Sequence, residues 1–492
     1  MASDNEAAMR LEALGDLRRC LDLAEEINDL EVVEGADPDL EIGALYELSL
    51  EDERPPVIVF DKINGFPEGY RVAVNVRSSK VFGVAEGLEQ VQQYRRHRRQ
   101  HHEPIDPVTV ETGPVMENVF EGAAVDTGAF PAPKWHQDDG GPYIGTECMV
   151  ITKDPDSGWV NAGTYRVQVH DKTTLCPFIE PGKHGDVIRR KYWARGEACP
   201  MVVSVGQAPV LGAAAASTAA EGVSEFAVAG ARIGRPIELL EGKHTGIPFP
   251  AAAEIVFEGF MPPPGEASVH EGPFGEWPGY YASNARLEPV LNVAAVYHRD
   301  DPIIVGAPPM RPVLPGFWYG TAGSAHFRAA SLWDELEAAG VPGVKGVWSM
   351  PGGGPRFIRV IAIEQLHAGH AKMAGLVAAG AGSSAYLGRM VIIVDDDIDI
   401  TNPAEVMWAL ATRWDPKTQT DIIDGCWTGY IDPMLLPERR EADDMTNSRI
   451  IIYAVRPYHW KDDFPKVNAV DKGYAEEVRK RWSAKLDFLK GS

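Results

Sequence analysis

The chain has 492 residues, 45% hydrophobic and 24% charged, which is the composition of a globular protein and excludes disorder as its main state. Its 47 Lys and Arg against 71 Asp and Glu give a net charge of −24, which argues against a nucleic-acid partner and against docking on anionic membranes. A small anionic ligand is not excluded, because it needs only a local cationic pocket. The length suggests about three domains.

Sequence signals of the cell compartment point to a cytoplasmic protein. The five cysteines are scattered and form no C-x-x-C pair, so neither a disulfide framework nor a thiolate zinc site is predicted. The first residues lack the cationic start and apolar core of a signal peptide. No run of about 18 apolar residues occurs, so we expect no transmembrane segment.

The first hundred residues are predicted to mix helices with short strands. Helical periodicity covers residues 14–24 and 84–100, and apolar β-rich runs cover residues 57–60 and 71–76. The second helix ends in a basic cluster, residues 95–99. We interpret this cluster as complementing the carboxyl end of the helix rather than as a nucleic-acid site.

Two different patterns follow. From residue 105 to about 320, short β-like runs are separated by Gly and Pro, which predicts a barrel or sandwich; the runs are 148–152, 166–170, 201–205, 254–258 and 290–297. Beyond a helix at 325–339, strands alternate with helices, which predicts an α/β domain; these elements are 357–363, 366–379, 390–394, 403–412 and 450–455. An amphipathic helix at 474–489 is expected to pack either on its own domain or on another subunit.

The familiar nucleotide, metalloprotease and serine-hydrolase motifs are absent, and the Gly-rich run 351–355 lacks the Gly-Lys-Ser/Thr of a P-loop. What remains is a set of polar residues in the strand-rich region: Asn161, Arg166, His184, Glu225, Glu271 and Glu276. An Asn oxygen, an imidazole and a carboxylate can hold a hard divalent cation with phosphate as an outer ligand. Two carboxylates beside one Arg can share a proton. Taken singly, each residue is also a plausible turn former or surface charge.

Several blocks in a fixed order carry a resemblance to a known family. They are residues 37–42, 161–166, 184, 222–225, 271–280, 395–399 and 407–416, and the strongest is Glu271-Gly272-Pro273-Phe274-Gly275-Glu276-Trp277-Pro278-Gly279-Tyr280. Together they resemble the UbiD-type family of prenylated-FMN-dependent decarboxylases over nearly the whole chain.

The resemblance implies roles for individual residues. Asn161, His184 and Glu225 match the ligands of a divalent ion, Mn²⁺ or Mg²⁺, that bridges to the flavin phosphate. Main-chain carbonyls near Ala215, Ala216 and Thr218 would hold K⁺. The residues expected to contact the flavin are Asn161, Thr164, Tyr165, Arg166, Lys183, His184, Ser217, Thr218 and Glu225. Arg166, Glu271 and Glu276 match the catalytic network, in which Glu276 reprotonates the carbon that lost carbon dioxide.

The resemblance also implies a fold of mixed α+β and α/β class and a division into parts. These are an N-terminal α/β part at 1–110, a split β-barrel that binds prenylated FMN at 111–322, a linker helix at 323–345, an α/β oligomerisation domain at 346–460 and a C-terminal helix at 461–492. The expected activity is reversible decarboxylation of an aromatic, heteroaromatic or α,β-unsaturated carboxylic acid, in a homodimer or homohexamer, with the cofactor supplied by a flavin prenyltransferase. The alternatives are a non-catalytic scaffold subunit of a larger carboxylase complex and a metal-dependent enzyme that uses unmodified FMN.

The sequence departs from the family at the substrate side. Lys183 stands where some relatives carry Gln, and the segment 308–319 has no His where phenol-acid decarboxylases of the family often carry one. This argues against a small hydroxybenzoate as substrate. One hypothesis is a pocket for a larger or heteroaromatic acid, lined by Arg311, Phe317, Trp318 and Tyr319; the alternative is a packed aromatic loop.

Overall fold

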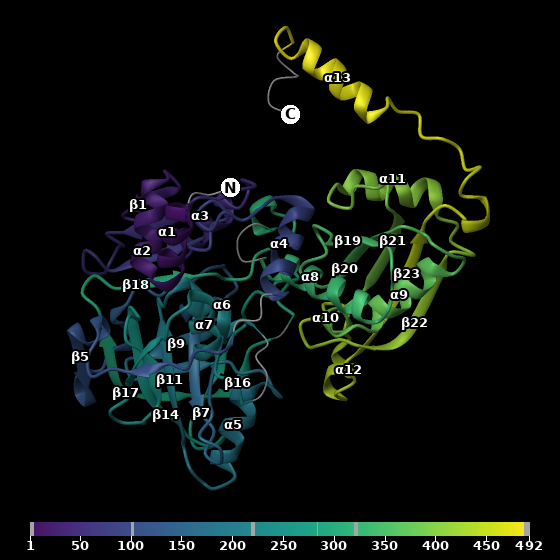
Figure 1. Ribbon diagram of the computed structural model, residues 1–492. Coiled ribbons are helices and arrows are strands. Elements are labelled where there is room, and N and C mark those ends of the chain that lie inside the picture. Colours follow the sequence, from purple (N-terminus) through teal and green to yellow (C-terminus); the bar gives the residue numbers. More distant parts are fainter. Residues whose placement is uncertain (1–3, 100–102, 218–221, 283, 319–322, 487–492) are drawn as a thin grey trace.

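The computed structural model describes residues 4–99, 103–217, 222–282, 284–318 and 323–486, arranged as two bodies with helices α4 and α8 between them (Figure 1). The first body contains a four-stranded sheet in the order β1-β2-β3-β18. Its strands are β1 (Leu30–Glu34), β2 (Val57–Asp61), β3 (Arg71–Val74) and β18 (Ile303–Gly306). Helices of the same region are α1 (Asp4–Gly15), α2 (Leu17–Glu26) and α3 (Glu41–Ser49). The apolar face of α2 packs on β2, β3 and β18. Strand β18 pairs with β3, so the chain returns to this sheet after leaving it for more than 200 residues.

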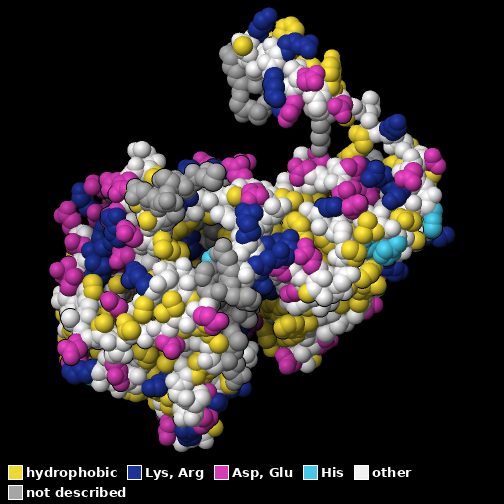
Figure 2. All heavy atoms as spheres, in the orientation of Figure 1, with side chains coloured by type: hydrophobic (Ala, Val, Ile, Leu, Met, Phe, Trp, Pro, Cys, Tyr) yellow, Lys and Arg dark blue, Asp and Glu magenta, His cyan; other side chains and the backbone are white. Residues whose placement is uncertain are grey.

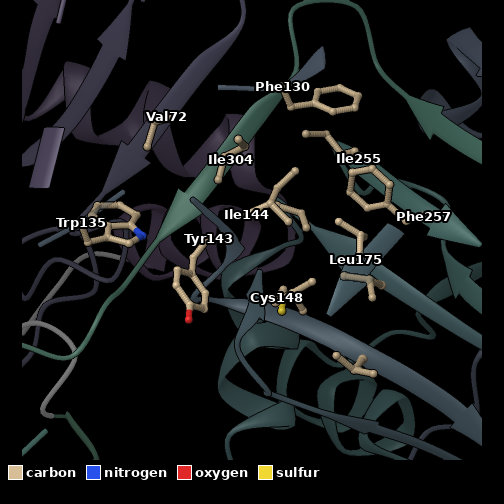
Figure 3. Close-up of a cluster of buried hydrophobic side chains, with 14 of the residues drawn as sticks. Val72, Phe130, Trp135, Tyr143, Ile144, Cys148, Leu175, Ile255, Phe257 and Ile304 are labelled. Atoms are coloured by element: carbon tan, nitrogen blue, oxygen red, sulfur yellow. The ribbon is translucent and has the colours of Figure 1, made fainter. Parts of the chain in front are cut away.

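A nine-stranded antiparallel sheet forms the rest of the first body and curls into half of a barrel, as the predicted fold class requires. Its order is β6-β9-β10-β17-β14-β11-β7-β8, with β5 beside β17. The strands are β5 (Asn118–Glu121), β6 (Tyr143–Gly145), β7 (Cys148–Lys153), β8 (Val160–Gly163), β9 (Val167–Asp171), β10 (Thr174–Pro177), β11 (Cys199–Val205), β14 (Ile255–Met261) and β17 (Leu291–His298). Helices α5 (His184–Trp193), α6 (Pro209–Ala215) and α7 (Glu225–Ile233) pack beside it. A buried apolar cluster joins this sheet to the N-terminal one: Val72 and Ile304 belong to the same cluster as Ile144 and Ile255, and Ile304 lies near Ile144 (Figure 3).

Two small sheets complete this body. One contains β4 (Val108–Thr109), β12 (Glu238–Glu241) and β13 (Pro248–Pro250). The other is the hairpin of β15 (Ser268–Glu271) and β16 (Arg286–Pro289), which carries the predicted glutamate motif.

The second body is an α/β layer built on a five-stranded sheet in the order β19-β20-β21-β23-β22. Its strands are β19 (Val344–Ser349), β20 (Ile358–Ile363), β21 (Met390–Asp395), β22 (Thr420–Trp427) and β23 (Thr446–Ala454). Its helices are α9 (His370–Gly380), α10 (Gly382–Ala385), α11 (Pro403–Arg413) and α12 (Pro437–Glu441). The three central strands are parallel, as the predicted alternation of strands and helices requires, whereas the edge strands β19 and β22 are antiparallel and were not predicted.

Helices α4 (Gly87–Arg99) and α8 (Gly323–Ala338) cross between the two bodies, and the basic end of α4 lies against α8. Arg95 Nε lies 2.9 Å from Asp334 Oδ1, and the Arg95 guanidinium sits 4.1 Å from the centre of the Trp333 ring. Arg99 also pairs with Asp334, at 3.0 Å. The basic cluster therefore holds two helices together, a role that the helix-end interpretation did not include.

The C-terminal helix α13 (Lys472–Trp482) stands apart from both bodies (Figure 1). None of the helices in the described part of the chain is long and apolar enough to cross a membrane. All five cysteines are present as free thiols.

Candidate active site

One guanidinium joins two carboxylates at the open edge of the half-barrel. Arg166 lies between β8 and β9, Glu271 ends β15, and Glu276 follows in the loop to β16. Arg166 Nε and Nη2 donate to the two oxygens of Glu271 at 2.7 and 2.8 Å. Arg166 Nη1 donates to Oε1 of Glu276 at 2.7 Å. The structure thus brings together the three residues predicted as the catalytic network.

This network is shielded from water. The side chains of Arg166, Glu271 and Glu276 are 9%, 0% and 16% exposed. The Phe178 ring lies under the Arg166 guanidinium, 4.4 Å from its centroid, which is a favourable cation–π contact. Burial of a charged triad is costly unless every charge is paired, and here each carboxylate meets the same guanidinium.

The Glu276 loop is anchored on both sides. Its main chain closes a tight turn, in which the Glu276 amide donates to the Tyr280 carbonyl at 3.1 Å and the Gly279 amide donates to the Glu276 carbonyl at 2.8 Å. The ring of Trp277 packs on Phe357 of the second body, with 5.2 Å between centroids. The loop therefore connects the half-barrel with the α/β body at the site itself.

The electrostatics suit a proton donor. Burial raises the pKa of the Glu276 carboxyl to about 7, against the lowering effect of Arg166, while the nearby Glu180 and Glu271 carboxylates raise it further. For Arg166, burial lowers the pKa, but the Glu271 and Glu276 carboxylates outweigh burial and raise it above its ordinary value. Arg166 therefore stays positively charged, and Glu276 can hold or release a proton near neutral pH.

The predicted metal ligands gather along β8. Asn161 Nδ2 donates to Oε1 of Glu225 at 3.0 Å, and the Ala162 amide donates to its other oxygen at 2.9 Å. His184 begins α5, and its ring lies 4.9 Å from that of Trp159, two residues before Asn161. Helices α5 and α7 both contact β8, so His184 and Glu225, which begin these helices, lie beside the strand that carries Asn161. Asn161 and Glu225 are in direct contact.

A divalent cation fits this donor set. Asn161 Oδ1 is buried and has no hydrogen-bond partner among the described residues, so one oxygen is free to coordinate. Burial raises the pKa of Glu225, opposed by the hydrogen bonds from Ala162 and Asn161, and an adjacent cation would favour its ionised form. Within the described ranges no three His, Cys, Asp or Glu side chains form a metal cluster; the predicted set has two such residues plus an amide.

The surroundings also suit a phosphate-bearing ligand. The amino ends of α5 and α7 both meet β8, and helix amino ends favour anions. Thr164 Oγ1 is buried without a partner in the described structure. Tyr165 packs closely between β8 and α5. A Cβ added to Gly163 would come within 2.6 Å of the Tyr165 ring, and one added to Gly185 within 3.3 Å.

The other predicted cofactor contacts are placed less tightly. Lys183 caps the start of α5, with its side chain 56% exposed and its Nζ 3.8 Å from Glu180. The Ser217 hydroxyl donates to the Ala214 carbonyl at 2.6 Å, next to Ala215 and Ala216. Thr218 lies outside the described residues.

The structure describes the predicted substrate pocket only in part. Arg311 is 62% exposed and its Nη2 lies 3.3 Å from Glu47, although its aliphatic part passes beside Gly279 of the Glu276 loop. The main chain of Phe317 and Trp318 forms a short 3₁₀ helix (Pro315–Trp318), in which the Gly316 amide donates to the Leu50 carbonyl at 2.8 Å. Tyr319 lies outside the described residues.

Three residues around the network were not predicted. Tyr143 donates its hydroxyl to Oε1 of Glu271 at 3.0 Å, and Gln168 Oε1 accepts from the Gly272 amide at 3.2 Å. Phe178 supports the guanidinium of Arg166. Tyr143 and Phe178 occur in short apolar runs that predict only core positions, so no sequence signal distinguished them.

Two family models match the chain in order. The 3-octaprenyl-4-hydroxybenzoate carboxy-lyase Rift-related domain matches residues 107–312, and the C-terminal domain of the same family matches residues 325–454. The pyrrole-2-carboxylic acid decarboxylase of Pseudomonas aeruginosa is 33% identical over 426 residues, covering 82% of this chain and 83% of that protein. The phenolic acid decarboxylase of Bacillus subtilis is 30% identical over 413 residues, covering 81% of this chain and 84% of that protein.

Solved structures agree with these relatives. The UbiD-class enzyme HmfF from Pelotomaculum thermopropionicum, in complex with FMN, superposes with a TM-score of 0.80 at 29% identity and covers 94% of this chain and 98% of its own. An evolved dimeric form of HmfF, in complex with prenylated FMN, gives a TM-score of 0.76 at 28% identity with the same coverage. Fold, domain models and relatives agree along the chain, which therefore belongs to the UbiD family of carboxy-lyases.

Proposed function

We propose that this chain uses prenylated FMN to decarboxylate, reversibly, an aromatic, heteroaromatic or α,β-unsaturated carboxylic acid. The observation that carries the proposal is the buried Arg166–Glu271–Glu276 network, because Arg166 follows shortly after β8, the strand on which Asn161 contacts Glu225. Relatives named as decarboxylases of pyrrole-2-carboxylic acid and phenolic acids support this substrate class, and the HmfF complexes support a flavin.

The residues that would hold the cofactor are those that the family resemblance implies, and the contacts along β8 support part of this set. Asn161, His184 and Glu225 would bind Mn²⁺ or Mg²⁺ at the flavin phosphate, and carbonyls near Ala215 and Ala216 would bind K⁺. The flavin contacts would come from Thr164, Tyr165, Arg166, Lys183 and Ser217. When bound, prenylated FMN supplies the electron sink that a carbon needs when it loses carbon dioxide.

The chain itself binds, orients and protonates. Arg166 stays cationic and attracts the substrate carboxylate into a site from which water is largely excluded. Glu276, protonated up to about neutral pH, delivers a proton to the carbon that has lost carbon dioxide, and the same carboxyl accepts a proton in the reverse direction. With an electron sink on the flavin, the reaction needs no protein nucleophile.

Two alternatives make different demands. A non-catalytic scaffold subunit would gain nothing from burying two carboxylates around one guanidinium, which is a costly arrangement. A metal-dependent enzyme that uses unmodified FMN would keep the β8 donor set and be fully active without the prenyl modification. Absorbance and mass of the bound flavin, after co-expression with a flavin prenyltransferase, separate this second alternative from the proposal.

The deciding experiment is a turnover screen with a variant at the proton donor. The reconstituted enzyme is assayed for carbon dioxide release, and for deuterium exchange into the decarboxylated product, on a panel that includes pyrrole-2-carboxylate and phenolic acids. Glu276→Gln should lower kcat by about 10²–10⁴-fold, the typical contribution of a general acid, and leave flavin bound. The control is Glu266→Gln, an exposed carboxylate before the same hairpin. Full activity of Glu276→Gln, or full activity with unmodified FMN, contradicts the proposal.

A further inference from the structure

Tyr143 on β6 is buried behind the catalytic network and contacts both Glu271 and the loop that leads to Glu276. None of its surface is exposed, and its hydroxyl donates to Oε1 of Glu271 at 3.0 Å. Its ring packs on Phe274, with 4.2 Å between centroids, and Phe274 lies in the loop between the two glutamates. Figure 3 shows the oxygen of Tyr143 directed away from the labelled apolar side chains, at the border of the buried cluster.

The two carboxylates differ in the number of donors that they meet. Glu271 accepts two hydrogen bonds from Arg166 and one from Tyr143. Glu276 accepts one, from Arg166 Nη1. Each hydrogen bond to a carboxylate favours its ionised form, so Glu276, which meets fewer donors, is the better place for a proton. In the described part of the chain, Tyr143 is the only uncharged side-chain donor to either carboxylate.

Beyond Arg166, the charges around the two carboxylates do not produce this asymmetry. The titratable and charged groups that face the network from neighbouring elements are Asp139, Cys176, Glu180, Arg189, Arg286, Glu288 and Tyr386. Acidic groups lie at both ends, with Glu180 acting on Glu276 and Glu288 acting near Glu271. Both carboxylates thus experience negative charge, whereas the Tyr143 hydroxyl serves only one of them.

We propose that Tyr143 is a positioning residue whose hydrogen bond holds Glu271 in its bidentate pair with Arg166 and confines the proton shared by the two carboxylates to Glu276. Burial raises the pKa of Tyr143 far above its ordinary value, as does the charge of Glu271, so the phenol remains a donor at every working pH. The functional consequence rests on the proposed role of Glu276 as proton donor. The hydrogen bond and its effect on the proton do not.

The activity test removes only the hydroxyl. In the enzyme loaded with prenylated FMN, Tyr143→Phe keeps the ring against Phe274 and lets the proton move in part to Glu271. We expect kcat to fall about tenfold, the effect of one hydrogen bond to a charged group, with KM changed less than about threefold. The fall of kcat at alkaline pH should move about one pH unit higher, because the pair now binds its proton more tightly.

A second measurement needs no turnover. The infrared carbonyl band of a protonated carboxyl, assigned to Glu276 by its absence from Glu276→Gln, should titrate with a midpoint about one pH unit higher in Tyr143→Phe. Incorporating 3-fluorotyrosine at position 143, a more acidic phenol and stronger donor, should move the midpoint the other way. This second variant keeps the test decisive if Tyr143→Phe folds poorly.

The matched control is Tyr297→Phe, which removes another buried Tyr-to-Glu hydrogen bond, 2.7 Å long, to Glu258 on the same sheet. It should leave kcat, the pH profile and the infrared midpoint unchanged. A midpoint that stays in place in both Tyr143 variants overturns the inference and reduces Tyr143 to packing. A midpoint that shifts in an enzyme that turns over no carboxylic acid supports the inference while the proposed function fails.

Discussion

Glu276 combines a buried position with a single hydrogen bond from Arg166, and this combination sets the expected pH dependence. Burial raises its pKa to about 7, so the carboxyl is protonated below that pH and ionised above it. In the proposed mechanism, decarboxylation requires the protonated form. We therefore expect kcat to be flat on the acid side of pH 7 and to fall about tenfold per pH unit above it. The measurement is kcat of the reconstituted enzyme against pH; a kcat that rises through pH 7 contradicts the assignment.

Asn161 offers a separate residue-scale test, because its amide supplies both a bond to Glu225 and a free oxygen. Asn161→Ala removes both. We expect the apparent affinity for metal and flavin to fall about 10–100-fold. The metal content and the flavin absorbance of the purified protein should fall accordingly. Asn292→Ala, an exposed amide on β17 of the same sheet, should leave both unchanged. Full metal and flavin content in Asn161→Ala would remove Asn161 from the predicted ligands.

The residues of the site were predictable where they belong to a motif and not where they act across the fold. Glu271 and Glu276 stand five apart in one motif, at the end of β15 and in the loop after it, and the family resemblance implied their pairing with Arg166. Tyr143 reaches Glu271 across 128 residues of sequence through the pairing of a short strand. A short apolar run carries no sign that one of its hydroxyls meets a buried carboxylate.

Among elements, the apolar strands at the centre of the second body were predicted from the sequence, whereas its edge strands were not. Strand β22 (Thr420–Trp427) is only partly buried along its length, so it lacks the apolar alternation of a half-buried strand. Strand β18 shows a different difficulty, because it was not among the predicted runs and its partner is distant in sequence. It pairs with β3, although the expected division groups residues 303–306 with the barrel. The predicted domain boundaries stay a proposal.

The contact between α4 and α8 yields a prediction at the scale of elements. The Arg95 side chain is 10% exposed, pairs with Asp334 and stacks on Trp333, so Arg95→Ala removes a largely buried ion pair and a cation–π contact. We expect a loss of about 2 kcal/mol from the midpoints of urea unfolding, with a coupling of similar size to Asp334→Ala in a double-mutant cycle. Arg96→Ala is the control, because its pair with Glu89 is exposed and should contribute less than about 0.5 kcal/mol. Equal effects of the two substitutions would contradict this reading of the basic cluster.

At the scale of the whole molecule, the charge of −24 and an anion-binding site are compatible. Figure 2 shows Asp and Glu side chains scattered over the visible face, where water screens them. At the site the cationic group is buried, with Arg166 only 9% exposed. Buried charges are screened far less, so the buried Arg166 can attract an anion there although the total charge of the chain is negative.

The helix α13 supplies the last prediction, because it is a short helix with no body beneath it (Figure 1). Isolated helices of this length are marginal in water, and Tyr474 and Trp482 leave 57% and 41% of their surface exposed along it. We expect this apolar side to pack on a second copy of the chain, in a homodimer or homohexamer. The variant Tyr474→Glu with Trp482→Glu should therefore lower the mass measured by light scattering after size exclusion. Val32→Glu, at an exposed apolar site on β1, should not change it. An unchanged mass for the double variant would leave α13 outside the subunit interface. The exposed edge strand β22 would then be the next candidate for that interface.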